Sequence, residues 1–276
     1  MASRDIETGS EDLHARIDDG VAILTMNRPE RRNALSGGML DGMARALAEC
    51  EVAPDVGSVV LTGAGGAFCS GGDVKGMAAR GSGGSGEGPS LDARIHLQRL
   101  SQRATAGRIY RMPKPVLAAL PGAAAGAGLS LALACDLRIA SERAVLVTAF
   151  ARVGFSGDYG GSFFLTRLVG PAKALELYYL SPRLDAKEAL DLGLLSRVVP
   201  EDALEGEALA LARELAHGPR VAYRYMKENV HRALDAELEE CLDLEATHHV
   251  HTGLTADHRE AARAFVEKRT PQFQGR

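Results

Sequence analysis

The sequence predicts an α/β fold in which buried strands lead through glycine-rich turns into helices. In residues 115–136, PVLAALPGAAAGAGLSLALACD, an apolar run, a Pro-Gly break and a Gly/Ala segment precede an apolar run of helical type. Residues 57–72 show the same order, with GSVVLTG followed by a loop that ends in Ser-Gly-Gly. From about residue 201 the apolar spacing is helical to the end. These observations predict one large α/β core followed by a helical C-terminal region.

Both junctions are suited to holding an oxygen atom that gains negative charge. Alanine and glycine keep side chains out of the way, so the backbone there can approach a ligand closely. The first N–H groups of a helix lack an intrahelical partner, and the helix dipole places partial positive charge at that end. Two such junctions in one layer could each direct one N–H group at a single oxygen, as a developing oxyanion requires.

Composition excludes several classes of function. The 276 residues are 46% hydrophobic and 25% charged, which suits a large globular domain. A net charge of −4 gives no electrostatic case for nucleic acid or an anionic membrane surface. No apolar run reaches the length of a membrane span, and the N-terminus is polar and acidic. We therefore expect a cytoplasmic protein with neither nucleic acid nor membrane as a partner.

The local patterns along the chain predict the following elements. Residues 1–12 are expected to be a loose, disordered tail, and residues 16–27 a hairpin that turns at Asp-Asp-Gly. Ser36 is the expected N-cap of a helix that continues to about Glu51. Residues 81–90, GSGGSGEGPS, are expected to be mobile, as an active-site flap rather than a domain linker. Residues 91–111 are expected to form one helix of about five turns.

The cysteines, the histidines and two near-matches to known motifs do not predict any other kind of functional site. The four cysteines form no CxxC pair and are expected to be reduced core thiols: Cys50, Cys69, Cys135 and Cys241. His248, His249 and His251 lack the spacing of metal ligands, because adjacent helical residues point about 100° apart. We expect no metal. Residues 154–158 only approximate GxSxG, and residues 122–128 match neither a dinucleotide nor a P-loop motif.

Two stretches, AFCSGGDVKGM and, about fifty residues later, KPVLAALPGAAAGAGLSLALACDLRIA, together resemble the signatures of the crotonase (enoyl-CoA hydratase/isomerase) superfamily. The resemblance covers residues 21–273. It implies a crotonase-like core of repeated ββα units, wound as a spiral, over residues 13–200. It also implies a helical trimerisation region over residues 201–276, in a homotrimer or homohexamer whose last helices help to cover a neighbouring active site. The implied substrate is an acyl-CoA thioester, and no separate cofactor is expected.

The resemblance also assigns roles to individual residues. The backbone amides of Ser70 and Ala127 would stabilise the oxygen of a thioester enolate. The loop that carries Arg28 and Arg32 would lie along the adenine and phosphate end of coenzyme A, although a plain solvated loop is the alternative. Further positions expected to line the substrate site are Ala67, Cys69, Gly71, Gly72, Asp73, Gly126, Gly128, Ser130, Phe150, Phe155 and Tyr159.

The chain departs from the hydratase pattern at two positions. Typical hydratases in the superfamily use two glutamates, and alignment on the flanking motifs places Ser130 and Phe150 at their positions. Asp158 remains, where some isomerases of the superfamily have a proton-transfer carboxylate and one dehalogenase has its nucleophile. An aspartate in Ser-Gly-Asp-Tyr-Gly also suits a turn or a helix N-cap.

We therefore favour an enoyl-CoA isomerase in which Asp158 is the single acid/base group. A 1,3-proton shift needs only one carboxylate, whereas addition of water normally enlists two. The alternatives are a hydratase with an atypical site, a CoA-thioester hydrolase or ring-opening enzyme that uses Asp158, and a catalytically silent acyl-CoA-binding homologue. Dehalogenation is less expected, because the chain has no tryptophan to play the supporting role that this residue has in the dehalogenase.

Overall fold

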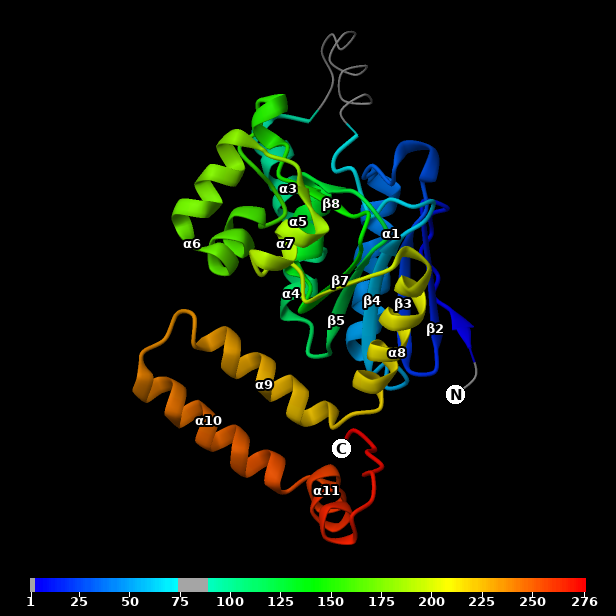
Figure 1. Cartoon of the computed structure of the whole chain (residues 1–276), viewed down its shortest axis with the longest axis vertical. Helices are drawn as coiled ribbons and strands as arrows, with labels where there is room; N and C mark the ends of the chain where they lie inside the picture. Colours follow the sequence, from blue (N-terminus) through cyan, green and yellow to red (C-terminus); the bar gives the residue numbers. More distant parts are fainter. Residues whose placement is uncertain (1–2, 74–88) are drawn as a thin grey trace.

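The computed structural model describes residues 3–73 and 89–276, so the expected flap at 81–90 lies almost wholly outside the described residues. The centre of the molecule is a seven-stranded sheet (Figure 1). Strands β1 to β3 pair antiparallel, whereas β3, β4, β5, β7 and β10 pair parallel. In sheet order the strands are β1 (Arg4–Asp5), β2 (Leu13–Asp18), β3 (Val21–Met26), β4 (Ser58–Gly63), β5 (Val116–Leu120), β7 (Leu137–Ser141) and β10 (Arg197–Val199).

A small second sheet and a series of helices complete the fold. The second sheet contains β6 (Ala124–Ala125), β8 (Val145–Val147) and β9 (Leu184–Asp185). The helices before the C-terminal region are η1 (Pro29–Arg31), α1 (Gly37–Val52), α3 (Leu91–Ala104), α4 (Ala106–Arg111), α5 (Ala127–Ala134), η2 (Phe150–Val153), α6 (Gly161–Leu180), α7 (Ala186–Asp191), η3 (Glu201–Ala203) and α8 (Leu204–Ala216).

The expectation that residues 1–12 form a loose tail is wrong for the described part of that segment. Residues Arg4–Asp5 pair with β2, and the Ile6 side chain is buried in the main core. Arg4 also forms ion pairs with Glu49 and Asp55. An apolar anchor and an added edge strand order this segment, because both are satisfied only when it lies against the sheet.

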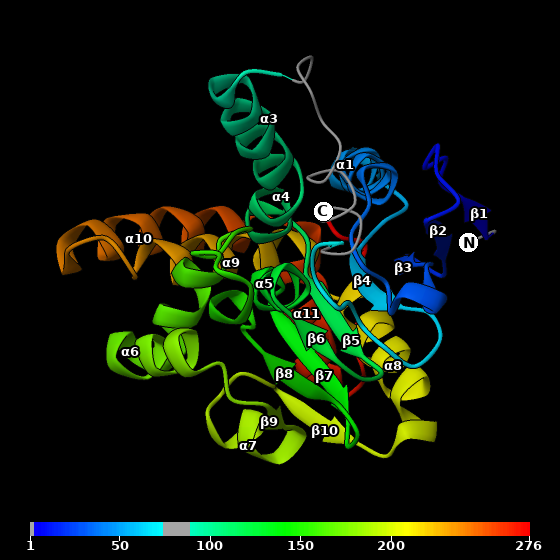
Figure 2. The same ribbon diagram turned by 90° about the horizontal axis from the view of Figure 1, so that it is seen from above.

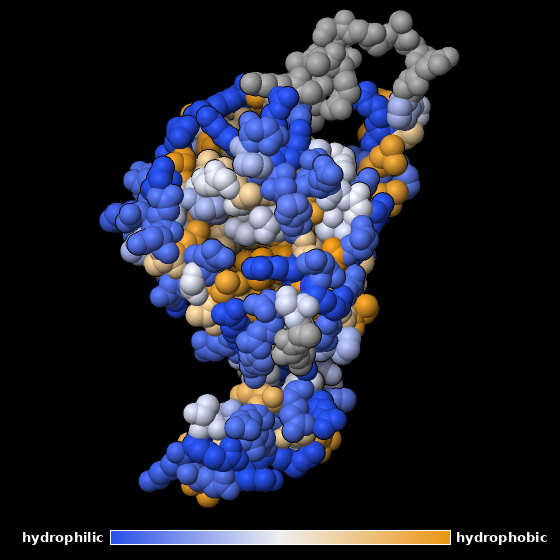
Figure 3. Space-filling model, turned by 90° about the vertical axis from the view of Figure 1, so that its right-hand side faces the viewer, coloured by the Kyte–Doolittle hydropathy of each residue, from blue (hydrophilic) through white to orange (hydrophobic). Residues whose placement is uncertain are grey.

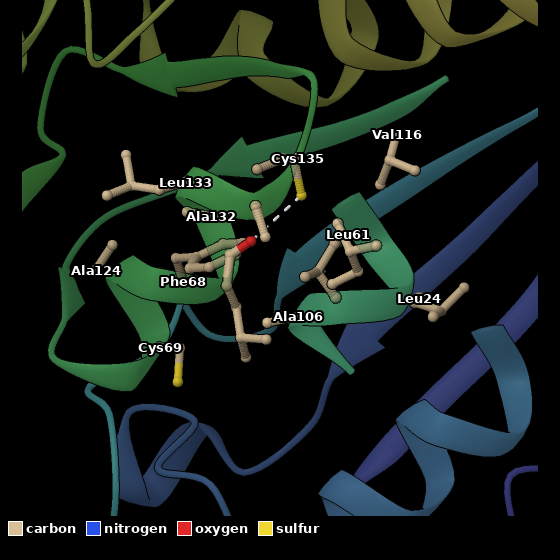
Figure 4. Close-up of a cluster of buried hydrophobic side chains, with 14 of the residues drawn as sticks. Leu24, Leu61, Phe68, Cys69, Ala106, Val116, Ala124, Ala132, Leu133 and Cys135 are labelled. Atoms are coloured by element: carbon tan, nitrogen blue, oxygen red, sulfur yellow. Dashed lines mark hydrogen bonds between the residues drawn. The ribbon is translucent and has the colours of Figure 1, made fainter. Parts of the chain in front are cut away.

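Helices cover both faces of the sheet (Figures 1 and 2). On one face, α1, α4 and α5 pack on the strands, and Figure 4 shows part of this core, including Phe68 and Val116. On the other face α8 buries an alanine stripe against the strands, and the Ser58 hydroxyl donates to the Ala212 carbonyl at 2.7 Å. All eight residues of α5 are buried, which explains why it is apolar on every side.

Several local predictions are confirmed. The hairpin turns between β2 and β3, and the Ser36 side chain accepts a hydrogen bond from the Met39 amide at the start of α1. In addition, a reciprocal capping box between Asp185 and Glu188 begins α7.

The predicted single helix over residues 91–111 is instead two helices that meet at Thr105. The Thr105 hydroxyl is buried and donates to the Ser101 carbonyl one turn earlier. A threonine that bonds back in this way bends a helix, and here the backbone at Thr105 leaves helical geometry altogether. The interruption sets α3 at an angle to the core, so that it projects from the body of the molecule (Figure 2).

After α8, the C-terminal region continues with three helices at one end of the molecule, α9 (Arg220–Arg232), α10 (Leu238–Gly253) and α11 (Ala256–Glu267) (Figure 1). Lys227 on α9 forms an ion pair with Asp136 at 2.8 Å, and the His231 ring stacks on Tyr110. Figure 3 shows the face on the right-hand side of Figure 1, where mainly hydrophilic residues surround an apolar band across the middle. The C-terminal helices leave large apolar side chains exposed: Met226, Val230, Leu238, Leu242, Val250, Leu254, Phe265 and Val266.

Candidate active site

The two glycine-rich junctions lie directly against each other. Gly71 has a φ of +92°, and a Cβ atom there would stand 2.8 Å from the Ala125 carbonyl oxygen and 3.5 Å from the Ala127 amide nitrogen. A Cβ atom on Gly128 would collide with Cys69. The Ala125 amide donates to the Cys69 carbonyl at 2.9 Å. These contacts explain why both stretches are rich in small residues, and they bring the beginning of α5 to the Ser70–Gly72 loop.

The two expected oxyanion donors differ in this structure. Ala127 is the first residue of α5, so its N–H group has no carbonyl one turn earlier in the helix to bond. The Ser70 amide, in contrast, donates to the Arg32 carbonyl at 2.9 Å. The expectation that both amides are unpaired is therefore wrong for Ser70. The reason is the loop before α1, where left-handed backbone at Arg32 and Asn33 turns the Arg32 carbonyl toward Ser70.

The arginine loop is held by internal contacts. Arg28 donates to the Ala34 carbonyl and lies 3.5 Å from Asp73 and 3.7 Å from Asp12. Its side chain is only 16% exposed, so much of its hydrogen-bonding capacity serves the loop itself. Arg32 is exposed beside it. Arg32 is thus the more available of the two predicted coenzyme A contacts.

Further predicted positions form the framework of the junctions. The buried Asn33 amide bridges the Ala64 and Ala67 carbonyls, which fixes the start of the Ser70 loop. Gly72 forms a single bridge with Leu35. Gly126 has a φ of +51° and donates to the Val147 carbonyl, which joins α5 to the small sheet. Cys69 is fully buried, and burial raises the pKa of its thiol to about 12, so it stays protonated at neutral pH.

Asp158 lies in the loop before α6. Among residues 3–73 and 89–276, its Oδ1 atom is buried and has no hydrogen-bond partner. Burial raises the pKa of this carboxyl from 3.8 to about 6. The N-cap of α6 is Gly160, which has no side chain to cap the helix, so the structure gives Asp158 no capping role there. An unpartnered carboxyl with a pKa near neutrality is suited to exchange protons.

Ser130 and Phe150, which were expected at the two hydratase glutamate positions, lie beside the glycines of the two loops: Ser130 next to Gly161, and Phe150 next to Gly126. Ser130 is in the first turn of α5, and its hydroxyl donates to the Gly126 carbonyl at 3.3 Å. Phe150 is 6% exposed and stacks on Tyr178 with 5.8 Å between ring centroids. Neither residue can ionise, so neither supplies a second acid/base group.

Sequence reasoning missed Tyr178. This residue lies on α6, seventeen residues after Gly161, in an apolar helical run that predicts core packing. A Cβ atom on Gly161 would stand 2.7 Å from the Tyr178 hydroxyl oxygen and closer still to the Ser130 hydroxyl. The glycines of the Asp158 loop were the only signal in the sequence, since they allow a large side chain to pack against that loop.

Tyr159 and Phe155 were both expected to extend the substrate pocket. Tyr159 is 4% exposed and has a left-handed backbone (φ +48°), and its amide donates to the Gln102 side chain on α3 at 2.8 Å. Its hydroxyl lies 3.2 Å from the Ser101 hydroxyl, so α3 fixes the residue next to Asp158. Phe155 is 56% exposed, between two glycines with positive φ at 154 and 157, so its role in the pocket stays a prediction.

Within the described residues, no group of three or more histidine, cysteine, aspartate or glutamate side chains could hold a metal ion. No helix in the described parts of the chain has both the length and the apolar character needed to cross a membrane.

Comparison with known proteins identifies the family. The family model described as enoyl-CoA hydratase/isomerase matches residues 16–276. The chain belongs to the enoyl-CoA hydratase/isomerase family. It is 39% identical, over 96% of its length and 98% of the relative's, to a Rhodobacter capsulatus protein named "Probable enoyl-CoA hydratase". It is 36% identical, over 96% of its length and 99% of the relative's, to the Escherichia coli 1,2-epoxyphenylacetyl-CoA isomerase.

Solved structures of this family confirm the predicted crotonase-type α/β fold. The enoyl-CoA hydratase from Bacillus anthracis superimposes with a TM-score of 0.87 at 32% identity, covering 96% of this chain and all of the other. The enoyl-CoA hydratase from Polaromonas sp. JS666 gives a TM-score of 0.85 at 35% identity, covering 95% of this chain and 99% of the other. As a member of this family, the chain is an enzyme that acts on acyl-CoA thioesters.

Proposed function

We propose that this enzyme is an acyl-CoA isomerase that moves a double bond by a 1,3-proton shift, with Asp158 as its only acid/base residue. The observation that carries the proposal is the buried, unpartnered Asp158 carboxyl with its pKa raised to about 6. The resemblance of the flanking motifs to the superfamily places Ser130 and Phe150 where a hydratase would have carboxylates. The name of the Escherichia coli isomerase is consistent with this choice, whereas the name of the Rhodobacter relative favours hydration.

The proposed reaction conserves protons at each step. The Asp158 carboxylate removes a proton from C2 of a 3-enoyl-CoA, and the electrons of that C–H bond form an enolate on the thioester oxygen. The protonated Asp158 then returns the same proton to C4 while the enolate collapses, which leaves a 2-enoyl-CoA. The Ala127 amide stabilises the enolate oxygen, and the helix dipole of α5 adds to this effect.

The hydrogen bond from the Ser70 amide to the Arg32 carbonyl occupies the second expected oxyanion donor. For Ser70 to contribute, its amide must exchange the Arg32 carbonyl for the thioester oxygen when substrate binds. Substrate binding would then be coupled to movement of the arginine loop, because Arg32 follows η1 directly.

The proposal is tested by assaying wild type and Asp158→Asn with 3-enoyl-CoA and with crotonyl-CoA. Asparagine has the same size but cannot accept the proton, and general acid/base groups contribute about 10²- to 10⁴-fold. We expect isomerisation to fall by a factor in that range, with coenzyme A affinity retained. Strong hydration of crotonyl-CoA that survives the substitution would favour an atypical hydratase and contradict the proposal.

We also propose that the enzyme is a homotrimer or a dimer of trimers assembled through the C-terminal helices. Support comes from the large apolar side chains left exposed there, among them Phe265 at 86% and Val266 at 80%. Light scattering at micromolar concentration is expected to give a mass of three or six chains. A monomer would contradict this assembly.

A further inference from the structure

The hydroxyl of Tyr178 lies in the site without a protein partner. It forms no hydrogen bond within the described residues, although its ring is fixed by stacking on Phe150. A Cβ atom on Gly157 would stand 3.3 Å from this hydroxyl oxygen, and one on Gly161 would stand 2.7 Å from it. Gly157 and Gly161 flank Asp158 in the chain, so the hydroxyl and the carboxyl border the same part of the site.

The surroundings keep this phenol neutral. Burial, together with the nearby Asp158 charge, raises the pKa of Tyr178 to about 12. It therefore carries its proton at any working pH and can donate a hydrogen bond. The Ser130 hydroxyl nearby donates to the Gly126 carbonyl, and no hydrogen bond in the described part of the chain joins it to the Tyr178 hydroxyl.

A plain hydrocarbon enoyl group bound beside it would leave the Tyr178 hydroxyl unpaired. A partly buried donor that loses water without gaining a partner is unfavourable, whereas an oxygen atom on the ligand would satisfy it. The parallel Phe150 and Tyr178 rings add an apolar aromatic wall to the same region. A donor next to a flat apolar wall suits an acyl group that combines an apolar body with one oxygen atom.

We propose that Tyr178 forms a subsite for an oxygen atom carried by the acyl group, so that the preferred substrates are oxygen-substituted acyl-CoA thioesters. This proposal rests on the proposed function only in placing the acyl group beside Asp158. Tyr178 Oη donates to the substituent oxygen and orients the acyl group relative to the Asp158 carboxylate. The subsite therefore selects substrates at a point distant from the thioester.

Ligand binding tests the subsite without turnover. Dissociation constants of phenylacetyl-CoA and of its 2-, 3- and 4-hydroxy derivatives are measured by calorimetry with wild type, Tyr178→Phe and Tyr179→Phe. Phenylalanine keeps the ring stacked on Phe150 and removes only the hydroxyl. Tyr179, 72% exposed on the same helix, provides a matched control for the chemical change.

We expect wild type to bind at least one hydroxylated ligand about fivefold more tightly than phenylacetyl-CoA, in line with one net hydrogen bond. Tyr178→Phe should reduce this preference to less than twofold, and Tyr179→Phe should retain it. Equal binding of all four ligands by wild type, or a preference that survives Tyr178→Phe, would overturn the proposal. If the variant fails to fold, equal binding of all four ligands by wild type still overturns the proposal.

A parallel measurement separates this proposal from the isomerase assignment. Asp158→Asn is titrated with the same four ligands. If the subsite exists, the variant keeps the preference for the hydroxylated ligand even though the proton-transfer group is gone. A preference lost in Asp158→Asn but kept in Tyr178→Phe would place the ligand hydroxyl on Asp158 and contradict the Tyr178 subsite, whatever the turnover assays show.

Discussion

Asp136 and Asp158 are two carboxylates near the same central helix with opposite environments. Asp136 follows α5, accepts from the Val116 amide at 2.8 Å and pairs with Lys227 at 2.8 Å. Asp158 lies in the loop before α6, where its Oδ1 has no partner among the described residues. Asp136 links the C-terminal helices to β5 through its ion pair with Lys227 and its hydrogen bond from the Val116 amide. Asp158 keeps its proton-exchanging capacity because no hydrogen bond or ion pair with the described residues stabilises its charged form.

The comparison predicts that Asp136→Ala is the more damaging substitution for stability. It leaves the Lys227 ammonium and the Val116 amide without their acceptor, and breaking a buried pair costs 3–5 kcal/mol. Both side chains retain some exposure, so we expect a loss of about 2 to 4 kcal/mol in the free energy of unfolding. Urea denaturation measures this loss. Restored stability in Asp136→Ala with Lys227→Met would confirm that the unpaired charge is the cause, whereas an unchanged midpoint in Asp136→Ala would contradict it.

The second prediction concerns the pH dependence of stability. Because folding raises the pKa of Asp158 from 3.8 to about 6, the native state holds this proton more tightly than the unfolded chain does. Stability from this group is therefore present below pH 4 and is lost as pH rises through 6. After allowance for the partial exposure of Asp158, the loss is about 1 to 2 kcal/mol.

Asp158→Asn removes this titration. Urea denaturation measures the free energy of unfolding of both proteins at pH 4.5 and pH 7.5. Between these pH values, wild type should lose about 1 to 2 kcal/mol more than the variant does. A parallel pH dependence of the two proteins would show that the Asp158 pKa is not raised in the folded state.

The third prediction tests how Asp158 is positioned. Gln102 holds the amide of Tyr159, whose left-handed backbone carries strain that the surroundings must offset. We expect Gln102→Ala to lower kcat about three- to tenfold, because misplacing a catalytic group weakens proton transfer. Gln102→Glu keeps the acceptor oxygen and should restore most of the rate. Arg103→Ala, at the exposed neighbouring position, serves as control, and a variant equal to wild type would remove the positioning role of Gln102.

The sequence alone predicted the fold class and the contact between the two glycine-rich junctions. Small residues at 71 and 128 predict close backbone contact, and the structure shows that contact, because a Cβ atom there would stand 2.8 Å from the Ala125 carbonyl oxygen or collide with Cys69. The lack of an intrahelical partner for the Ala127 amide follows from its place at the start of a helix. These features depend on local chemistry, which the sequence carries directly.

Other features depend on contacts between distant residues. The Arg32 carbonyl accepts the hydrogen bond of the Ser70 amide only because left-handed backbone at Arg32 and Asn33 turns the loop before α1 back on itself. Ile6 orders the N-terminal segment through the core, and Tyr178 reaches the site only through the fold of α6. No spacing pattern encodes such contacts. They are therefore the points at which the predictions for the tail, for Ser70 and for the site wall were wrong or incomplete.

The pH–rate profile of 3-enoyl-CoA isomerisation tests the central claim most directly. If the Asp158 carboxylate is the base, kcat/KM should fall about tenfold per pH unit below an apparent pKa of about 6. Asp158→Asn should lose this acid limb together with 10²- to 10⁴-fold of the rate. A wild-type profile that is flat through pH 6, or a variant within about threefold of wild type, would contradict the assignment of Asp158 as the proton-transfer group.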